Sequence, residues 1–375
     1  MQNRNPLLKA LFGLRLDWCL AAIITTAGLF LGFGPGWLAD LSNPLWFAFL
    51  LGWLFAAILI SAFAVVRHAE GLALKLGEPL GTLVLTLSVT GIEVMMIAAV
   101  MYAGHGKSSL ARDAMFAVVM IVLNGMVGLS LLLGGLRFHE QTYNLQGVNA
   151  FLAVIVPLAV LGLVLPNFTV SSPGPTFSSL QAAFLIIMSV GLYGVFLAIQ
   201  NVRHRDYFVA PESPKGDPSI AVHGGRSVAY HASLLLGYLL PLVILSKQMA
   251  VPINYSIDVL RAPPALGGFL VAVIILSPEA LSAARAALAN QLQRSVNILL
   301  GSVLATISLT IPAVLTLGFI TDQRVVLGLD AVDMILLVLT LALNTLTFAS
   351  ARTNMLLGAV HLLLFLAYLM LIFEK

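Results

Sequence analysis

Charged side chains are scarce in this chain of 375 residues: Asp, Glu, Lys and Arg together make up 9% of it. An ordinary soluble domain is about one-quarter charged, so this scarcity excludes a soluble globular protein. It also excludes intrinsic disorder, which needs low hydrophobicity and many charges. Cysteine is nearly absent, with Cys19 as the only one, which excludes a disulfide-stabilised scaffold. The composition therefore indicates a protein embedded in a lipid bilayer.

Apolar residues make up 60% of the chain, and the mean hydropathy is +1.01. A helix that crosses a bilayer needs about 20 mostly apolar residues, whereas a membrane β-strand would show about ten residues of alternating polarity. The apolar runs have the length of helices, and they cover residues 18–34, 44–66, 79–103, 111–136, 148–166, 179–200, 229–250, 265–287, 295–319, 331–350 and 355–373. We therefore predict an all-α polytopic membrane protein with about eleven transmembrane helices.

The first apolar run follows Arg4, Lys9 and Arg15, as the apolar core of a signal peptide would. No small-residue cleavage site lies before the next run, so we interpret this segment as a retained first helix.

Basic residues predict the orientation, because loops rich in Lys and Arg stay in the cytoplasm. With the N-terminus inside, thirteen of the 19 basic residues face the cytoplasm: Arg4, Lys9, Arg15, Arg67, Lys75, Arg137, Arg203, Arg205, Lys215, Arg226, Arg285, Arg294 and Arg352. The other six face outward: Lys107, Arg112, Lys247, Arg261, Arg324 and Lys375. We therefore expect a cytoplasmic N-terminus and an external C-terminus.

The longest polar stretch, near residues 201–228, has no apolar periodicity and is expected to be a cytoplasmic linker. It divides the chain into an N-terminal helix (1–43), a first repeat (44–200) and a second repeat (229–375). Each repeat contains five predicted spans, and an odd number of spans forces the two repeats to insert upside down relative to each other. Inverted halves are typical of transporters whose substrate site lies at the middle of the bilayer.

Two glutamates lie within the predicted spans, where a charge is unfavourable. Glu93 is close to the middle of the third run, and Glu279 is just past the middle of the eighth. A charge at the centre of a membrane helix costs at least about 2.5 to 3.5 kcal/mol, so these acids indicate function rather than structure. Each occupies the second helix of its repeat, so the two carboxylates are expected to meet at one central cation and proton site.

Polar side chains near these acids supply further oxygen atoms. The candidate ligands are hydroxyl and amide groups within the spans, namely Thr90, Asn124, Ser277, Ser302 and Thr306. Pro278 is expected to break its helix and free carbonyl oxygens beside Glu279. Carboxylate, hydroxyl, amide and carbonyl oxygens suit hard cations such as sodium, potassium and calcium.

Simpler explanations stay open for several of these groups. A Ser or Thr hydroxyl in a membrane helix often bonds its own backbone. Glu78 is either a vestibule acid or a favourable charge at a helix N-terminus, and Asp333 has the same N-terminal explanation. His361 either relays protons or is hydrogen-bonded between helices.

Two segments resemble the α-repeats of the cation/Ca²⁺ exchanger superfamily: LGEPLGTLVLTLSVTGIEV at 76–94 and ILSPEALSAARAALANQLQRSVNILLGSVLATISLTIP at 275–312. The likeness is strongest to the ChaA-type bacterial sodium, potassium and calcium:proton antiporters, and it extends over nearly the whole chain. It implies a sodium/calcium exchanger-like fold in the bacterial inner membrane, with one N-terminal helix and two inverted five-helix repeats. It also implies that Glu93 and Glu279 are the paired acids of the ion site and that Ser302 is a hydroxyl of the second repeat.

The chain departs from this family in the residues before each acid. Related calcium:proton exchangers carry Gly-Asn-Ala there, whereas this chain has Val-Thr-Gly at 89–91 and Ile-Leu-Ser at 275–277. The amide ligands of that motif are missing, so the preferred cation stays open.

The predicted function is secondary antiport, in which calcium and/or sodium and potassium leave the cell in exchange for protons. Cations and protons would compete for Glu93 and Glu279 while the site opens to one side at a time. The expected partners are these ions and lipid, without nucleic acid or a resident cofactor; the oligomeric state stays open. No Ser/His pair, paired aspartates or zinc motif lies at midspan, which disfavours an enzyme. A cation channel and a transporter of another small solute remain the alternatives.

Overall fold

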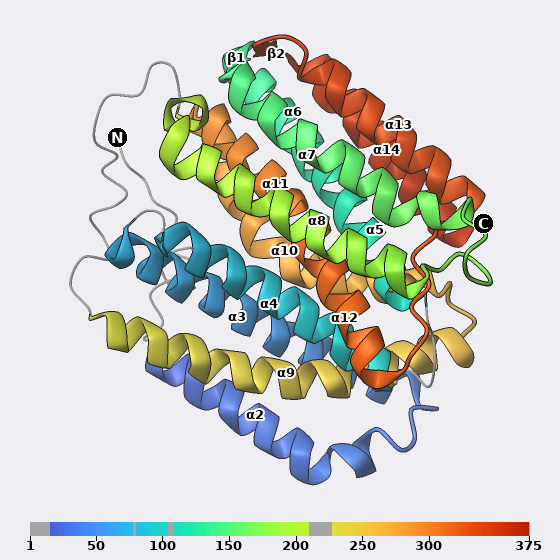
Figure 1. Ribbon diagram of the computed structural model, residues 1–375. Helices are drawn as coiled ribbons and strands as arrows, with labels where there is room; N and C mark the ends of the chain where they lie inside the picture. Colours follow the sequence, from blue (N-terminus) through green and yellow to red (C-terminus); the bar gives the residue numbers. More distant parts are fainter. Residues whose placement is uncertain (1–15, 78–79, 104–108, 210–226, 375) are drawn as a thin grey trace.

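Helices account for nearly all of the computed structural model, which describes residues 16–77, 80–103, 109–209 and 227–374 (Figure 1). The main helical segments follow the eleven predicted spans in order: α2 (Leu16–Trp37), α3 (Pro44–Leu76), α4 (Leu80–Ala103), α5 to α6 (Leu110–Phe138), α7 (Leu145–Leu163), α8 (Ser179–Ala198), α9 (Val228–Asp258), α10 (Ala265–Leu288), α11 to α12 (Leu292–Thr321), α13 (Ala331–Thr347) and α14 (Met355–Phe373).

Within the described part of the chain, nine helices are long and apolar enough to cross a membrane. The two remaining spans contain shorter apolar helices, Leu83–Ala98 within α4 and α13. The fold is that of a polytopic membrane protein with one N-terminal helix and two inverted five-helix repeats, as the sequence predicts. In the division predicted from the sequence, the first repeat corresponds to α3 to α8 and the second to α9 to α14.

The third span of each repeat contains a wider helical turn near its middle. In the first repeat, the π-helical segment η1 (Ile121–Met126) joins α5 to α6. In the second, η6 (Thr306–Thr310) joins α11 to α12. Such π-segments occur mostly as single turns inside α-helices and often mark functional sites.

Side-chain caps set the beginnings of several helices. Asn43 accepts hydrogen bonds from two backbone amides at the start of α3, where Pro44 also fits because its missing N–H has no helical partner. Ser178 and Gln181 form a reciprocal capping box at the start of α8. These caps satisfy backbone amides that would otherwise lack a partner at the membrane surface.

The first helices of the two repeats, α3 and α9, pack against each other, and α2 and α4 also contact α9 (Figure 1). In this view α6, α7, α8, α11, α13 and α14 lie above α4. A ladder of two short antiparallel strands, β1 (Gln141–Thr142) and β2 (Arg352–Thr353), joins a loop of the first repeat to a loop of the second.

Several helices extend beyond the apolar runs that predict them. The run at 44–66 becomes a helix that continues to Leu76, and the run at 229–250 becomes one that continues to Asp258. Hydropathy reports contact with lipid, whereas a helix can continue into polar surroundings as long as its backbone hydrogen bonds persist. The extension of α3 carries charged residues that are absent from the predicted span.

The expected break at Pro278 is wrong, because α10 is continuous from Ala265 to Leu288. A proline removes one backbone donor and one hydrogen bond, and a membrane helix tolerates this loss when nearby groups take up the carbonyl. Several predicted charged positions lie outside the described residues, as does most of the predicted linker: Arg4, Lys9, Arg15, Glu78, Lys107 and Lys375.

Candidate ion-binding site

A cavity of about 270 Å³ lies between the two repeats and contains both predicted acids. Glu93 reaches it from α4, and Glu279 reaches it from α10. The lining runs from the exposed side chains of Glu70 and Arg294 to Glu93, which is only 3% exposed. The cavity therefore connects the surface at the end of α3 and the start of α11 with the buried carboxylate.

Both carboxylates are hydrogen-bonded to one face of the α11–η6 helix. The Ser302 hydroxyl donates to Oε2 of Glu279 at 2.5 Å, and the Thr306 hydroxyl donates to Oε2 of Glu93 at 2.9 Å. Residues four apart lie one above the other on a helix, so the two hydroxyls are one turn apart. One helix of the second repeat thus holds an acid from each repeat.

Glu93 keeps one carboxylate oxygen unsatisfied. Its Oε1 is buried and has no hydrogen-bond partner among the described residues, while Oε2 accepts from Thr306. A buried carboxylate oxygen without a donor is unfavourable unless a proton or a cation binds it. The two acids also lie close enough for their charges to repel each other. Both features favour the binding of positive charge in the cavity.

The α4 face that carries Glu93 also lines the cavity through hydroxyls. Thr86 and Thr90 both contribute to the lining, and Thr90 is 6% exposed. The structure therefore places five of the predicted site residues in one cavity: Glu93, Glu279, Thr90, Ser302 and Thr306. Within the described ranges, no group of three or more His, Cys, Asp or Glu has the geometry of a metal site.

Two of the predicted ligands lie elsewhere. The Ser277 hydroxyl donates to the Val273 carbonyl of its own helix, and the residue is not part of the cavity lining. The Asn124 amide is fully buried in η1, where it donates to Thr340 at 2.7 Å. Its Oδ1 faces Nδ1 of His361 at 3.2 Å, so the amide is engaged outside the cavity.

His361 is hydrogen-bonded between helices. Its Nδ1 faces Asn124 and its Nε2 lies 2.9 Å from the Thr347 hydroxyl, and the imidazole is fully buried. Asp333 lies in the first turn of α13, which fits the predicted favourable charge at a helix N-terminus.

Sequence analysis missed the charged residues at the outer part of the cavity. Glu70 and Arg294 both line it, and the polar side chains of Gln200 and Asn297 lie in the same lining. Glu70 follows the apolar run at 44–66, where the predicted span ends, and Arg294 precedes the run at 295–319. Glu70 lies one helical turn after Val66, and Arg294 lies two turns before Ser302, so each pair shares a helical face. This spacing is the signal that could have identified Glu70 and Arg294.

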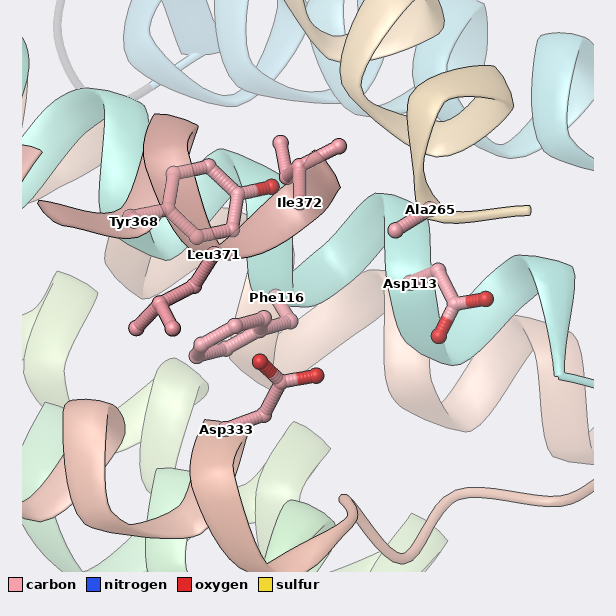
Figure 2. Close-up of a pocket in the computed structure, with 7 residues that line it drawn as sticks. All are labelled: Asp113, Phe116, Ala265, Asp333, Tyr368, Leu371 and Ile372. Carbon is pink, nitrogen blue, oxygen red and sulfur yellow. The ribbon is translucent and has the colours of Figure 1, made fainter. Parts of the chain in front are cut away.

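A second pocket lies where α5, α10 and α13 begin and α14 ends (Figure 2). Figure 2 shows Asp113, Asp333 and Tyr368 around the ring of Phe116. Asp113 forms an ion pair of 2.7 Å with Arg112. The pocket measures about 10 Å³, enough for about one water molecule, so it is far smaller than the cavity that holds the two glutamates.

Two inverted five-helix repeats each place a carboxylate in one cavity. This arrangement defines the class of the molecule as an ion-exchanging secondary transporter. A model of the sodium/calcium exchanger protein family matches residues 46–202 and 231–374. The chain therefore belongs to the sodium/calcium exchanger family, which confirms the predicted superfamily.

Curated relatives cover most of the chain. It is 44% identical over 319 residues to the sodium-potassium/proton antiporter ChaA of Escherichia coli strain K12, a match that spans 84% of this chain and 86% of that protein. It is 42% identical over 312 residues to the putative ionic transporter y4hA of Sinorhizobium fredii, spanning 83% and 85% of the two chains.

Solved structures share the fold. The structure of native YfkE has a TM-score of 0.73 at 16% identity and covers 96% of this chain and 100% of that chain. The H⁺/Ca²⁺ exchanger CAX has a TM-score of 0.66 at 14% identity and covers 95% and 88%. At such identities the likeness establishes the shared helical architecture.

Proposed function

We propose that this protein is a cation:proton antiporter that exports sodium, potassium or calcium in exchange for protons. The observation that carries the proposal is the hydroxyl pair of Ser302 and Thr306, which holds Glu279 and Glu93 in one cavity. The similarity to a sodium-potassium/proton antiporter supports the same function.

Exchange follows from competition for the same oxygens. When both acids are ionised, the two charges repel each other and are unfavourably buried. A bound cation or bound protons reduce both unfavourable contributions. A cation that enters the cavity displaces protons from the pair, and protons arriving from the opposite side displace the cation. Two negative charges accommodate one divalent ion, or one monovalent ion together with a proton. The transported ions are the substrates, and the scheme requires no resident cofactor.

The position of the cavity is that of a site that loads from the cytoplasm. The cavity reaches the surface where α3 ends and α11 begins, and the distribution of Lys and Arg predicts this end to be cytoplasmic. A cation bound from the cytoplasm leaves outward once the site has reoriented between the inverted repeats. Inward proton flow then drives the cation out, provided that the protein rarely reorients while the site is empty and doubly charged.

Neutralising either acid tests the proposal. We expect Glu93→Gln and Glu279→Gln each to abolish cation-dependent proton movement in everted membrane vesicles, since an amide neither exchanges a proton nor balances the cation charge. Glu140→Gln is the matched control, because Glu140 is 59% exposed and forms a surface ion pair with Arg352. Exchange at the wild-type rate in either cavity variant would refute the assignment. Cation movement without proton movement in the wild type would instead indicate a channel.

A further inference from the structure

Glu70 provides the cavity with a third acid, nearer to the surface than the other two. It belongs to the last turns of α3 and is exposed, while Glu93 is buried. We call the outer part of the lining, formed by Glu70, Gln200, Arg294 and Asn297, the mouth of the cavity.

The α11 helix gives the spacing between the mouth and the paired acids. Arg294, Ile298, Ser302 and Thr306 follow one another at intervals of four residues and all line the cavity. At a rise of 1.5 Å per residue, Arg294 lies about 12 Å along the helix axis from Ser302. A cation entering from this end therefore passes the mouth before it reaches the carboxylate that Ser302 holds.

Two positive charges act on Glu70 at the mouth. Arg294 attracts its carboxylate most strongly, followed by Arg67, which lies three residues earlier on the same helix. On the inner side, the charge of Glu70 acts on Glu279. Glu70 therefore lies close enough to Arg294 and to Glu279 for its charge to interact with both.

We propose that Glu70 captures inorganic cations that enter the cavity, in competition with Arg294, and thereby sets the apparent cation affinity. This inference rests on the proposed antiport. The Glu70 carboxylate attracts cations and repels the negative Glu279 site, so a cation shared between them relieves both charges. Arg294 opposes capture by attracting the same carboxylate and by repelling the cation. Glu70 is not required to exchange protons and acts before the central step.

Cation-dependent proton flux in proteoliposomes tests this role, with sodium, potassium and calcium titrated separately. We expect Glu70→Gln to raise KM about fivefold, because the attraction of one unit charge is lost, while the rate at saturating cation stays within about twofold of the wild type. Glu70→Asp keeps the charge and is expected to restore a KM close to the wild-type value. Arg294→Gln is expected to lower KM. The decrease is expected to be smaller when Arg294→Gln is combined with Glu70→Gln.

The matched control is Arg352→Gln, which removes a guanidinium from an exposed pair outside the cavity and should leave KM unchanged. Raised salt is expected to reduce the difference between wild type and Glu70→Gln, because salt screens exposed charges. An unchanged KM in Glu70→Gln would overturn the inference, as would loss of exchange at saturating cation. Glu93→Gln tests the antiport itself, so the two failures are distinguishable.

Discussion

Ser302 and Thr306 act on the two acids in the same way, although the acids come from different repeats. Each hydroxyl donates to an Oε2 atom, and hydrogen bonds to charged groups are stronger than those between neutral groups. Each bond therefore stabilises the ionised carboxylate, which is the form that binds a cation. In the proposed antiport, these two contacts favour the cation-binding form of each acid over its protonated form.

We predict that Thr306→Val weakens cation binding without removing the acid. Loss of a hydrogen bond to a charged group is worth about 1.5 kcal/mol or more, which corresponds to an increase in KM of about tenfold. Ser302→Ala is expected to act in the same direction through Glu279. Ser277→Ala is the matched control, because that hydroxyl bonds the carbonyl of Val273 in its own helix. Equal KM values for Thr306→Val and wild type in a flux titration would contradict this prediction.

The sequence was sufficient to predict the acids but only some of their neighbours. Glu93 and Glu279 were predictable because an ionisable group at midspan has little structural use. Ser277 and Asn124 are equally polar and equally central, yet their side chains are satisfied by Val273 and by Thr340. Helical spacing shows which residues share a face, but the direction and partner of each side chain depend on neighbouring helices.

Helices α6 and α14 approach each other closely through glycine. A Cβ atom at Gly358 would lie 2.5 Å from the backbone nitrogen of Leu132, and one at Gly128 would lie 2.9 Å from the carbonyl oxygen of Gly358. Small residues allow membrane helices to pack backbone against backbone, where hydrophobic burial does not drive association. This contact joins the third span of the first repeat to the last helix of the second.

We predict that Gly358→Ala destabilises the protein by about 1 to 3 kcal/mol, because the added methyl group forces the helices apart. Thermal unfolding in detergent measures the effect as a lower Tm. Gly194→Ala on α8 is the control, since a Cβ there meets no atom within 4 Å. A Tm for Gly358→Ala that equals the Tm of the control would show that the close contact does not contribute to stability.

At this scale the sequence predicted the number and order of helices better than their extent. Apolar runs are sufficient to identify the spans because lipid requires them. The continuation of α3 to Leu76 and the unbroken course of α10 through Pro278 depend on packing and backbone hydrogen bonds, which hydropathy does not report. Glu70 was missed for this reason.

The whole molecule combines an inverted repeat with pockets of very unequal size. The cavity with both glutamates measures about 270 Å³ and reaches the end where α3 finishes and α11 starts, while the pocket near Asp113 and Asp333 holds about one water. Inverted repeats permit a second arrangement in which the opposite side opens. The proposed antiport needs both arrangements and one shared set of carboxylate oxygens.

Proton release upon cation binding tests the shared carboxylates most directly, because it requires neither a gradient nor a complete transport cycle. Purified protein in weakly buffered detergent solution would receive sodium, potassium or calcium while an indicator dye reports the released protons. We predict saturable release from the wild type by at least one of these cations and none from a protein carrying both Glu93→Gln and Glu279→Gln. Cation binding by the wild type without proton release, or full release from the double variant, would contradict the account.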